Sequence, residues 1–221
     1  MNKQFEKDLR SENGFCSKEV WCDEKALFTD DSLIIAGHHV MDKWQSNYMR
    51  CLAKISSKYG GRILEVGYGM GIAAEFVEMN KNVEQHVIIE CHPDVVKKCR
   101  SIYRKKIEEA KVVIYEDFWE NVTSNFPEGY FDGILFDTYP LSQKEIRKNH
   151  FFFFVEAYRL LRKGGVLTYY SDETENFSEI HMAKLREAGF ESIDKKMVKV
   201  DPPESCAYWE SNSILAPIVK K

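Results

Sequence analysis

The stretch Glu65-Val66-Gly67-Tyr68-Gly69-Met70-Gly71 decides the fold of this chain. A short apolar run, residues 63–66, leads into three alternating glycines, and an apolar segment with helical periodicity, residues 72–79, follows them. Glycine permits a tight turn with positive φ and lets a ligand approach the backbone closely. In open parallel sheets, ligands bind beyond the carboxyl ends of the strands. We therefore predict a strand–loop–helix unit that binds a nucleotide-like ligand.

Strand-like and helix-like segments alternate after this loop. The sequence predicts strands at 86–90, 112–115, 133–136 and 166–170, and helices at 93–105, 142–161 and 177–188. The tail, residues 193–200 and 208–219, is typical of two strands with no helix between them. Alternation implies a parallel sheet, and the closing strand pair implies one antiparallel strand at its edge. The predicted fold is α/β and Rossmann-like: a seven-stranded, mostly parallel sheet with one antiparallel edge strand and helices on both faces.

The length of the chain bounds its domain organisation. At 221 residues it is long enough for one sizeable α/β domain and short for two. We predict one globular domain over residues 41–221, which begins with an amphipathic helix from Met41 to about Tyr59. Residues 1–40 are polar with isolated aromatic side chains. They are expected to form an irregular arm or a short helix, either solvated or folded over the rest.

Composition and charge argue against several classes of protein. A formal net charge of −4 is unlike proteins that bind phosphate backbones, which usually carry a basic surplus. The chain has no apolar run of about 18 residues, and its amino terminus is too charged for a signal peptide. The 6 cysteines are scattered, so we expect reduced thiols. The histidines lack zinc-binding spacing. We therefore expect a cytoplasmic protein without a metal, a nucleic-acid partner or a membrane partner.

Acidic residues follow three further predicted strands. Glu90 ends the second strand, about 20 residues past the glycine loop, where an acid accepts hydrogen bonds from ribose hydroxyls. The third strand is followed by Glu116-Asp117-Phe118-Trp119, which suits the edge and face of an adenine. The fourth strand delivers Asp137, with Thr138-Tyr139-Pro140 directly after it. A solvated carboxylate is the alternative for each acid taken alone, whereas three at successive strand ends favour a binding site.

With these residues in place, the chain resembles guanidinoacetate N-methyltransferase and, more distantly, the fungal-type arginine methyltransferases. The resemblance runs from about Trp21 to Val219, and its most specific stretch is Asp137-Thr138-Tyr139-Pro140-Leu141-Ser142. Other dense stretches are 40–44, 63–74, 88–91, 130–136, 164–169, 202–203 and 217–219. The resemblance implies a class I methyltransferase fold. It also implies S-adenosylmethionine as cofactor, S-adenosylhomocysteine as product, and no metal.

The resemblance also implies residue roles. Asp137 would be the catalytic carboxylate, which orients the acceptor nitrogen and takes its proton as that nitrogen attacks the methyl group. Trp21 would belong to an amino-terminal arm, residues 1–40, that closes over the site. Met41 and Met49 would line the cleft near the sulfonium, with plain core packing as the alternative. From the motifs themselves we also expect cofactor contacts at Gly67, at Phe118 and at Glu65, which could meet the ligand's ammonium. The full set of expected cofactor-binding residues is Trp21, Met41, Met49, Glu65, Gly67, Tyr68, Gly69, Met70, Gly71, Ile72, Ala73, Glu90, Cys91, His92, Phe118, Trp119 and Glu120.

Two departures from the family bear on the acceptor, which we expect at Gln45, Asp137, Asp172 and Glu173. Where the family has a second carboxylate that helps to hold a guanidinium, this chain has Gln45. Gln45 accepts a hydrogen bond but cannot compensate charge, so it holds a cation less tightly. The loop after the fifth strand, residues 171–176, is shorter than the family's carboxylate-binding loop and carries three acids. These acids repel a carboxylate and attract a cationic group, unless the loop is simply solvated.

Three functions remain open. The first is N-methylation of a small guanidino or amino compound by a monomer or homodimer. The second is N-methylation of arginine in a peptide or protein, which Glu90-Cys91-His92-Pro93-Asp94 favours because it resembles the arginine-methylating relatives. The third is a methyltransferase-like binding module without catalysis. The intact glycine loop, Glu90 and Asp137 argue against the third function.

Overall fold

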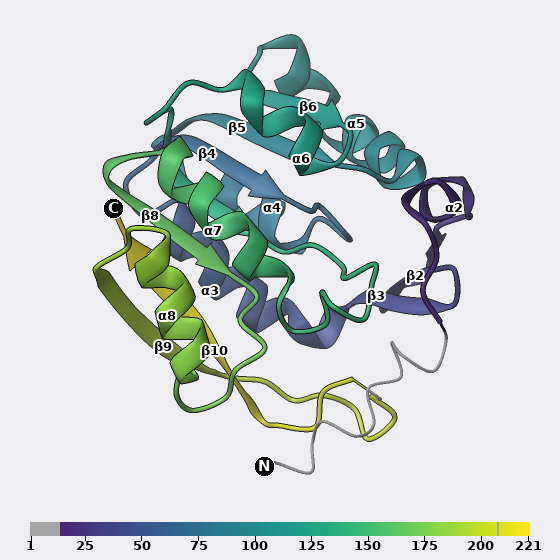
Figure 1. Cartoon of the computed structure of the whole chain (residues 1–221). Helices are drawn as coiled ribbons and strands as arrows, with labels where there is room; N and C mark the ends of the chain where they lie inside the picture. The colour runs from purple at the N-terminus through teal and green to yellow at the C-terminus, as the bar shows by residue number, and fades with distance from the viewer. Residues whose placement is uncertain (1–13, 207) are drawn as a thin grey trace.

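A seven-stranded sheet forms the centre of the computed structural model, which describes residues 14–206 and 208–221 (Figure 1). In spatial order the strands are β6 (Val112–Glu116), β5 (Val83–Glu90), β4 (Gly61–Val66), β7 (Phe131–Phe136), β8 (Leu161–Tyr169), β10 (Ser213–Lys220) and β9 (Ser192–Lys199). Neighbours from β6 to β8 are parallel, whereas β10 runs antiparallel to both β8 and β9. The predicted Rossmann-like, mostly parallel sheet is confirmed. Its antiparallel strand, β10, lies one position in from the β9 edge.

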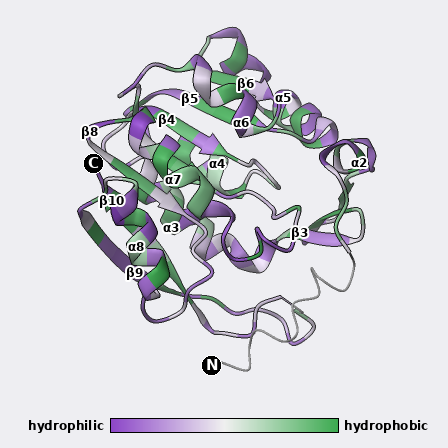
Figure 2. Cartoon of the chain, in the orientation of Figure 1, coloured by the Kyte–Doolittle hydropathy of each residue, from purple (hydrophilic) through white to green (hydrophobic). Residues whose placement is uncertain are grey.

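Helices cover both faces of the sheet (Figure 1). One face packs against α3 (Ser46–Ser56), α4 (Ile72–Glu78) and α5 (Pro93–Glu108), and the other against α6 (Trp119–Val122), α7 (Asn149–Leu160) and α8 (Glu179–Glu187). Along β4, Ile63 joins the first apolar cluster and Leu64 joins the second. Strands buried on both faces need near-continuous apolar sequence. Figure 2 accordingly shows hydrophobic residues concentrated in the strands.

The amino-terminal segment is more ordered than the sequence indicated. Residues 1–13 of the predicted arm lie outside the described residues. The rest forms α2 (Lys18–Asp23) and a three-stranded antiparallel sheet of β1 (Leu27–Phe28), β2 (Ser32–Ile35) and β3 (His38–Asp42). The expectation of an irregular arm was therefore wrong over residues 27–40. Ala36 and Gly37 both adopt positive φ between paired residues of β2 and β3, which is the geometry of a tight two-residue hairpin turn.

Two predicted helices begin later than expected. The helix predicted from Met41 begins at Ser46, because Met41 belongs to β3 and residues 43–45 form a 3-10 turn. The helix predicted from Ser142 begins at Asn149. Before it, the Leu141 amide donates to Glu145 Oε2 at 2.7 Å and the Glu145 amide donates to the Ser142 carbonyl at 3.0 Å. These turns satisfy the backbone without a helix. Among the described residues, no helix combines the length and apolar character needed to cross a membrane.

The glycine loop between β4 and α4 adopts the conformation that its sequence predicts. Gly67, Gly69 and Gly71 have φ of +87°, +56° and +81°. At Gly67 the missing side chain also allows close packing, since a Cβ there would lie 2.0 Å from the carbonyl oxygen of Asp137. The absence of a side chain at Gly67 thus lets the ends of β4 and β7 meet. This contact places Asp137 beside the glycine loop.

We expect Gly67→Ala to destabilise the chain by clearly more than Gly37→Ala. Gly37 also has positive φ, but a Cβ there meets nothing within 4 Å. Gly37→Ala should therefore lower the free energy of unfolding only by the cost of a strained backbone, about 1–3 kcal/mol. Gly67→Ala carries the same strain and in addition must push the carbonyl of Asp137 away. Urea unfolding of both variants measures the difference, and equal losses would contradict the packing role of Gly67.

Candidate functional site

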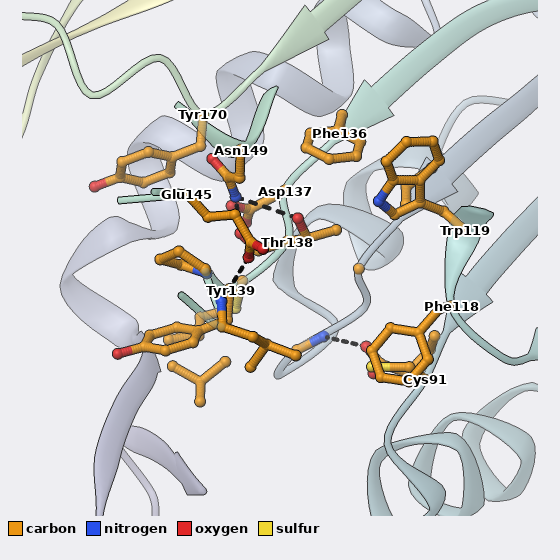
Figure 3. A pocket seen from close by; sticks show the side chains of 18 of the residues that line it. Cys91, Phe118, Trp119, Phe136, Asp137, Thr138, Tyr139, Glu145, Asn149 and Tyr170 are labelled. Carbon is orange, nitrogen blue, oxygen red and sulfur yellow. Dashed lines mark hydrogen bonds between the residues drawn. The ribbon is translucent and has the colours of Figure 1, made fainter. Parts of the chain in front are cut away.

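A cavity of about 420 Å³ lies at the carboxyl ends of the central strands (Figure 3). Val66 and Gly67 of β4, Glu90 of β5, Asp137 after β7 and Tyr170 after β8 contribute to its wall. The amino-terminal segment closes another side with Trp21 and Met41. The carboxyl edge of an open sheet is where such folds bind ligands. The cavity therefore lies where the glycine loop predicts a binding site.

Glu90 faces this cavity with its carboxylate held in a fixed orientation. One oxygen accepts from the Tyr68 amide at 2.8 Å and the other from the His92 amide at 2.9 Å. Glu90 is buried, and Gly69 also points its amide towards it at 3.5 Å. An ionised carboxylate has about four lone-pair sites, so these bonds leave acceptor capacity for the hydroxyls of a ligand. Glu90 therefore presents a preorganised acceptor beside the glycine loop.

Aromatic residues form the wall next to Glu90. Trp119 packs edge-on against Phe153 at 5.2 Å between ring centroids, which fixes its plane. Lys18 of α2 donates to Glu120 Oε1 at 2.9 Å and lies 4.2 Å above the ring of Phe118. Phe118 and Trp119 lie on the side of the cavity opposite Tyr139 and Tyr170 (Figure 3). The wall thus offers a flat apolar surface to an aromatic ring. Lys18 connects α2 to this wall through Glu120 and Phe118.

Trp21 connects the amino-terminal segment to the loop after β7. Its ring stacks on that of Tyr139 at 5.2 Å between centroids, with 10° between the planes. The hydroxyl of Tyr139 lies 3.0 Å from Nδ1 of His38, at the start of β3. Trp21 is buried although it belongs to the short helix α2. The described part of the predicted arm therefore packs on the cavity.

Asp137 lies between the aromatic walls (Figure 3). Its amide donates to the Val66 carbonyl at 2.8 Å, so the backbone at the end of β7 is fixed against β4. Burial, and to a smaller extent the negative charges of Glu65 and Asp172, together raise the pKa of the Asp137 carboxyl to about 7. A carboxyl that titrates near neutral pH suits a general base. A cation bound beside Asp137 would favour its ionised form.

Asp172 contributes a second carboxylate to the same cavity. It follows β8 and adopts φ of +55°, a left-handed backbone that a non-glycine residue occupies at a cost of about 1–3 kcal/mol. The neighbouring Ser171 fixes this turn, because its hydroxyl donates to the Leu215 carbonyl at 2.7 Å. Like charges at Asp137 and Asp172 disfavour each other's ionised form. Together they favour a positively charged group at this end of the cavity.

The loop after Asp137 is held by side chains that the sequence did not single out. Asn149 Nδ2 donates to the Thr138 carbonyl at 2.5 Å and to Thr138 Oγ1 at 3.2 Å (Figure 3). Glu145 lines the cavity with Asn149 while it accepts from the Leu141 amide. Neither residue was predicted for the site, because both lie inside the long helix that the sequence predicts over 142–161. Tyr170 and Tyr208, which also line the cavity, were missed as well.

Gln45 lines the cavity but is engaged in a hydrogen-bonded set at its edge. Its Nε2 donates to the Tyr208 hydroxyl at 3.4 Å, and its Oε1 accepts from the Asp42 amide at 3.4 Å. Tyr208 in turn donates to Asp42 Oδ2 at 2.5 Å. Gln45 therefore connects β3 to the carboxyl-terminal tail, and it brings no charge into the cavity.

The structure brings together about half of the residues predicted for the site. Those that line the cavity are Trp21, Met41, Gln45, Gly67, Gly69, Glu90, Cys91, Phe118, Trp119, Glu120, Asp137 and Asp172. Those outside its lining are Met49, Glu65, Tyr68, Met70, Gly71, Ile72, Ala73, His92 and Glu173. Most members of the second group have structural partners instead.

Five of the residues outside the lining have contacts that explain why they face elsewhere. Glu65 of β4 pairs with Nε2 of His86 on the neighbouring strand β5 at 2.9 Å. Tyr68 packs edge-on against Tyr103 of α5, and the His92 side chain accepts from the Asp94 amide as the N-cap of α5. Glu173 Oε1 lies 3.5 Å from His181 Nδ1 of α8. Met49 is fully buried in the core, as the packing alternative proposed.

Similarity to known proteins points to one family. The family model of guanidinoacetate N-methyltransferase matches residues 10–221. Protein arginine N-methyltransferase 2 of Aspergillus fumigatus is 27% identical over 217 residues, which cover 90% of this chain and 50% of that protein. Its Saccharomyces cerevisiae counterpart is 29% identical over 140 residues, 59% of this chain and 33% of that protein. The chain thus spans half or less of the length of these relatives.

Solved structures share the fold at low sequence identity. Spermidine synthase of Thermotoga maritima superposes with a TM-score of 0.63 at 16% identity, over 89% of this chain and 72% of that one. M. jannaschii TYW2 in complex with AdoMet superposes with a TM-score of 0.58 at 12% identity, over 89% of this chain and 84% of that one. These likenesses support the Rossmann-like architecture.

Proposed function

Because the chain belongs to the guanidinoacetate N-methyltransferase family, we propose that it is an S-adenosylmethionine-dependent N-methyltransferase that acts on the guanidino group of a small compound. One observation carries this proposal. Asp137 and Asp172 contribute two carboxylates to a cavity whose other walls are Glu90, the glycine loop and an aromatic pair. The end of the cavity with Asp137 and Asp172 suits a cationic acceptor. The end with Glu90, the glycine loop and the aromatic pair suits a nucleoside.

The residues at the Glu90 end of the cavity fit S-adenosylmethionine. Glu90 keeps acceptor capacity for the two ribose hydroxyls while backbone amides hold it in place. Phe118 and Trp119 offer flat surface to the adenine, and Gly67 and Gly69 let the ligand approach the backbone. When bound, the cofactor supplies a methyl group activated by a positively charged sulfur. The chain's own residues then have to hold and deprotonate the acceptor.

Asp137 supplies the acid–base chemistry in this proposal. A guanidinium is protonated at neutral pH, and its nitrogens are poor nucleophiles while the charge is delocalised. The Asp137 carboxylate accepts a hydrogen bond from one nitrogen, turns it towards the methyl group, and takes its proton during attack. Positioning the reacting atoms in line contributes much of the remaining rate enhancement. The stacked rings of Trp21 and Tyr139 add apolar surface to the wall of the cavity.

Asp172 compensates for the missing charge at Gln45 in this proposal. We expect Asp172→Asn to weaken binding of a guanidino acceptor by about 5- to 30-fold, because a charged hydrogen bond is worth about 1–2 kcal/mol more than a neutral one. Removing the negative charge of Asp172 also lowers the pKa of Asp137. The acidic limb of kcat/KM, which the pKa of Asp137 near 7 sets, should therefore move to lower pH.

The matched control is Glu175→Gln, which neutralises an exposed acid of the same loop outside the cavity. Its acceptor KM and its pH profile should equal those of the wild type. If both variants change the acceptor KM equally, the effect belongs to the charge of the whole loop. That result would contradict a specific role of Asp172 in binding the acceptor.

A second candidate is arginine in a peptide, and two observations favour it. The curated relatives are named protein arginine N-methyltransferases. A second cavity of about 770 Å³ also adjoins the first and shares His39, Tyr139 and Tyr208 with it. Its lining carries acidic residues, Asp31, Asp42, Asp201 and Glu204. An acidic groove next to the acceptor end offers space for the chain that flanks an arginine.

An assay with radiolabelled S-adenosylmethionine separates the candidates. The panel contains guanidinoacetate, arginine, agmatine and an arginine peptide. We expect agmatine and arginine to be labelled faster than guanidinoacetate, whose only other group is a carboxylate that the acidic loop repels. Labelling of the peptide alone would select the second candidate. Binding of S-adenosylhomocysteine without labelling of any acceptor would contradict the proposed function.

A further inference from the structure

A third groove lies away from the candidate site, between α3 and the β9–β10 pair. It has a volume of about 660 Å³ and shares no lining residue with either cavity at the site. One wall comes from α3 and the turn after it, and the opposite wall comes from β9 and β10. The mechanism proposed above uses none of these residues.

Positive charge is concentrated around this groove. Of its 16 lining residues only Asp194 is acidic, whereas six are basic: Arg50, Lys54, Lys58, Lys196, Lys199 and Lys220. The chain as a whole carries a formal net charge of −4, so this surface differs sharply from the average. In the described part of the chain none of the six forms an ion pair, whereas Lys18, Lys111 and Lys184 elsewhere do.

The six cations are brought together by the fold. Burial raises the pKa of the Cys51 thiol, and the positive charges of Lys196 and Lys54 oppose that rise. Cys51 is thus flanked by one lysine from α3 and another from β9, which are 142 residues apart in the numbering. Like charges held close together repel one another, and an anionic ligand relieves that repulsion. The groove is therefore poised to bind an acidic partner.

The floor of the groove is apolar. Cys51, Ile55, Val166, Val198 and Ile218 line it between the two rows of cations. At its edge the ring of Tyr59 is 44% exposed and adds apolar surface. The phosphates of a nucleic acid are charged, so they would gain no binding energy from contact with this apolar floor. An apolar centre with a charged rim is the anatomy of a protein-binding surface.

The edge of the sheet adds a further feature. Strand β9 is outermost and pairs only with β10 among the described residues, so its outer backbone groups face away from the sheet. Such an edge can accept an extended segment of another chain through backbone hydrogen bonds. Alternate side chains of that segment would point towards the groove. We propose that the groove docks an acidic segment of a partner protein, with apolar side chains on the floor and carboxylates at the cationic rim.

The test is fluorescence anisotropy of the full chain with a labelled peptide of the repeat valine–serine–glutamate–serine, which places valine and glutamate on the same face of an extended strand. The expected result is saturable binding that weakens as salt is added, because the rim cations attract the glutamates through solvent-exposed charges. Three competitors are titrated in the same way: the same peptide with glycine in place of valine (the glutamate–glycine peptide), the same peptide with lysine in place of glutamate, and a single-stranded RNA. Each should bind at least about tenfold more weakly.

The matched variants are Lys54→Glu/Lys196→Glu within the groove and Lys81→Glu/Lys97→Glu outside it, which change net charge equally. The first pair should weaken peptide binding by at least about tenfold, and the second pair should leave it unchanged. If charge reversal prevents folding, Lys54→Gln/Lys196→Gln is used instead. Absence of peptide binding at low salt, equal binding of the glutamate–glycine peptide, tighter binding of RNA, or equal effects of the two pairs would each overturn the proposal.

Discussion

Replacement of Asp137 by asparagine is expected to lower kcat by about 10²–10⁴-fold, the range over which a positioned general base contributes. Asparagine keeps the size of the side chain and can still accept a hydrogen bond. It cannot take the proton that the guanidino nitrogen releases, and it does not compensate the guanidinium charge. Because Asp137 and Glu90 lie at different strand ends, the affinity for S-adenosylhomocysteine in calorimetry should stay close to that of the wild type.

Asp117→Asn is the matched control for this experiment. Asp117 also lines the cavity, but it precedes the aromatic pair Phe118 and Trp119, and it accepts from Asn121 Nδ2 at 2.8 Å. Its replacement should change the affinity for the cofactor more than kcat. Near-normal turnover in Asp137→Asn would contradict the role of Asp137 as base, whatever the control shows.

His86→Ala is expected to lower the free energy of unfolding by about 3–5 kcal/mol, the usual cost of breaking a buried ion pair by removing one partner. His86 is fully buried, with Nε2 2.9 Å from Glu65 Oε2 and Nδ1 2.9 Å from Glu78 Oε1. Lys106 Nζ lies 2.5 Å from the other oxygen of Glu78. Alanine would leave Glu65 buried at the end of β4 without a counter-charge. Urea unfolding at pH 7 measures the loss.

The pH dependence distinguishes this ion pair from simple packing. Burial lowers the pKa of His86, but the hydrogen bonds and charges of Glu65 and Glu78 prevail and raise it to about 9. The folded-state pKa therefore lies above the value of about 6.5 in the unfolded chain. The stability that protonated His86 contributes is complete below about pH 6.5 and is lost as pH rises through about 9.

The gap in stability between the wild type and His86→Ala should accordingly narrow between pH 7 and pH 9.5. His39→Ala is the matched control, because His39 is exposed and its pairing with Asp42 is worth about 0–1 kcal/mol. A gap for His86→Ala that does not change with pH would show that the side chain acts by packing alone.

Much of the fold follows from patterns that are local in sequence. The parallel strands are buried on both faces, so their apolar runs stand out, and β4, β5 and β6 are each followed by a helix that begins within a few residues. The small amino-terminal sheet was missed because β1 has only two residues and β2 four, too few to show a period. The late start of α7 depends on the turn that Glu145 stabilises, which no periodicity reveals.

The candidate site was predictable where strand ends converge. Glu90, Asp137 and the glycine loop come together because the carboxyl ends of adjacent parallel strands meet at one edge. Side-chain direction was not predictable in a strand buried on both faces. Glu65 faces His86 rather than the cavity, although the glycine motif suggested a ligand contact. Tyr208 reaches Gln45 from the far end of the chain, a contact that depends on the whole sheet.

We propose that this protein transfers a methyl group to a guanidino nitrogen bound in the cavity. The most direct test uses S-adenosylmethionine with a ¹³C-labelled methyl group and agmatine with ¹⁵N-labelled guanidino nitrogens, followed by NMR of the product. We expect a one-bond ¹³C–¹⁵N coupling in the product, which should form at least about a hundredfold more slowly with Asp137→Asn. A labelled methyl group without that coupling, or the same product from the variant at the wild-type rate, would contradict it.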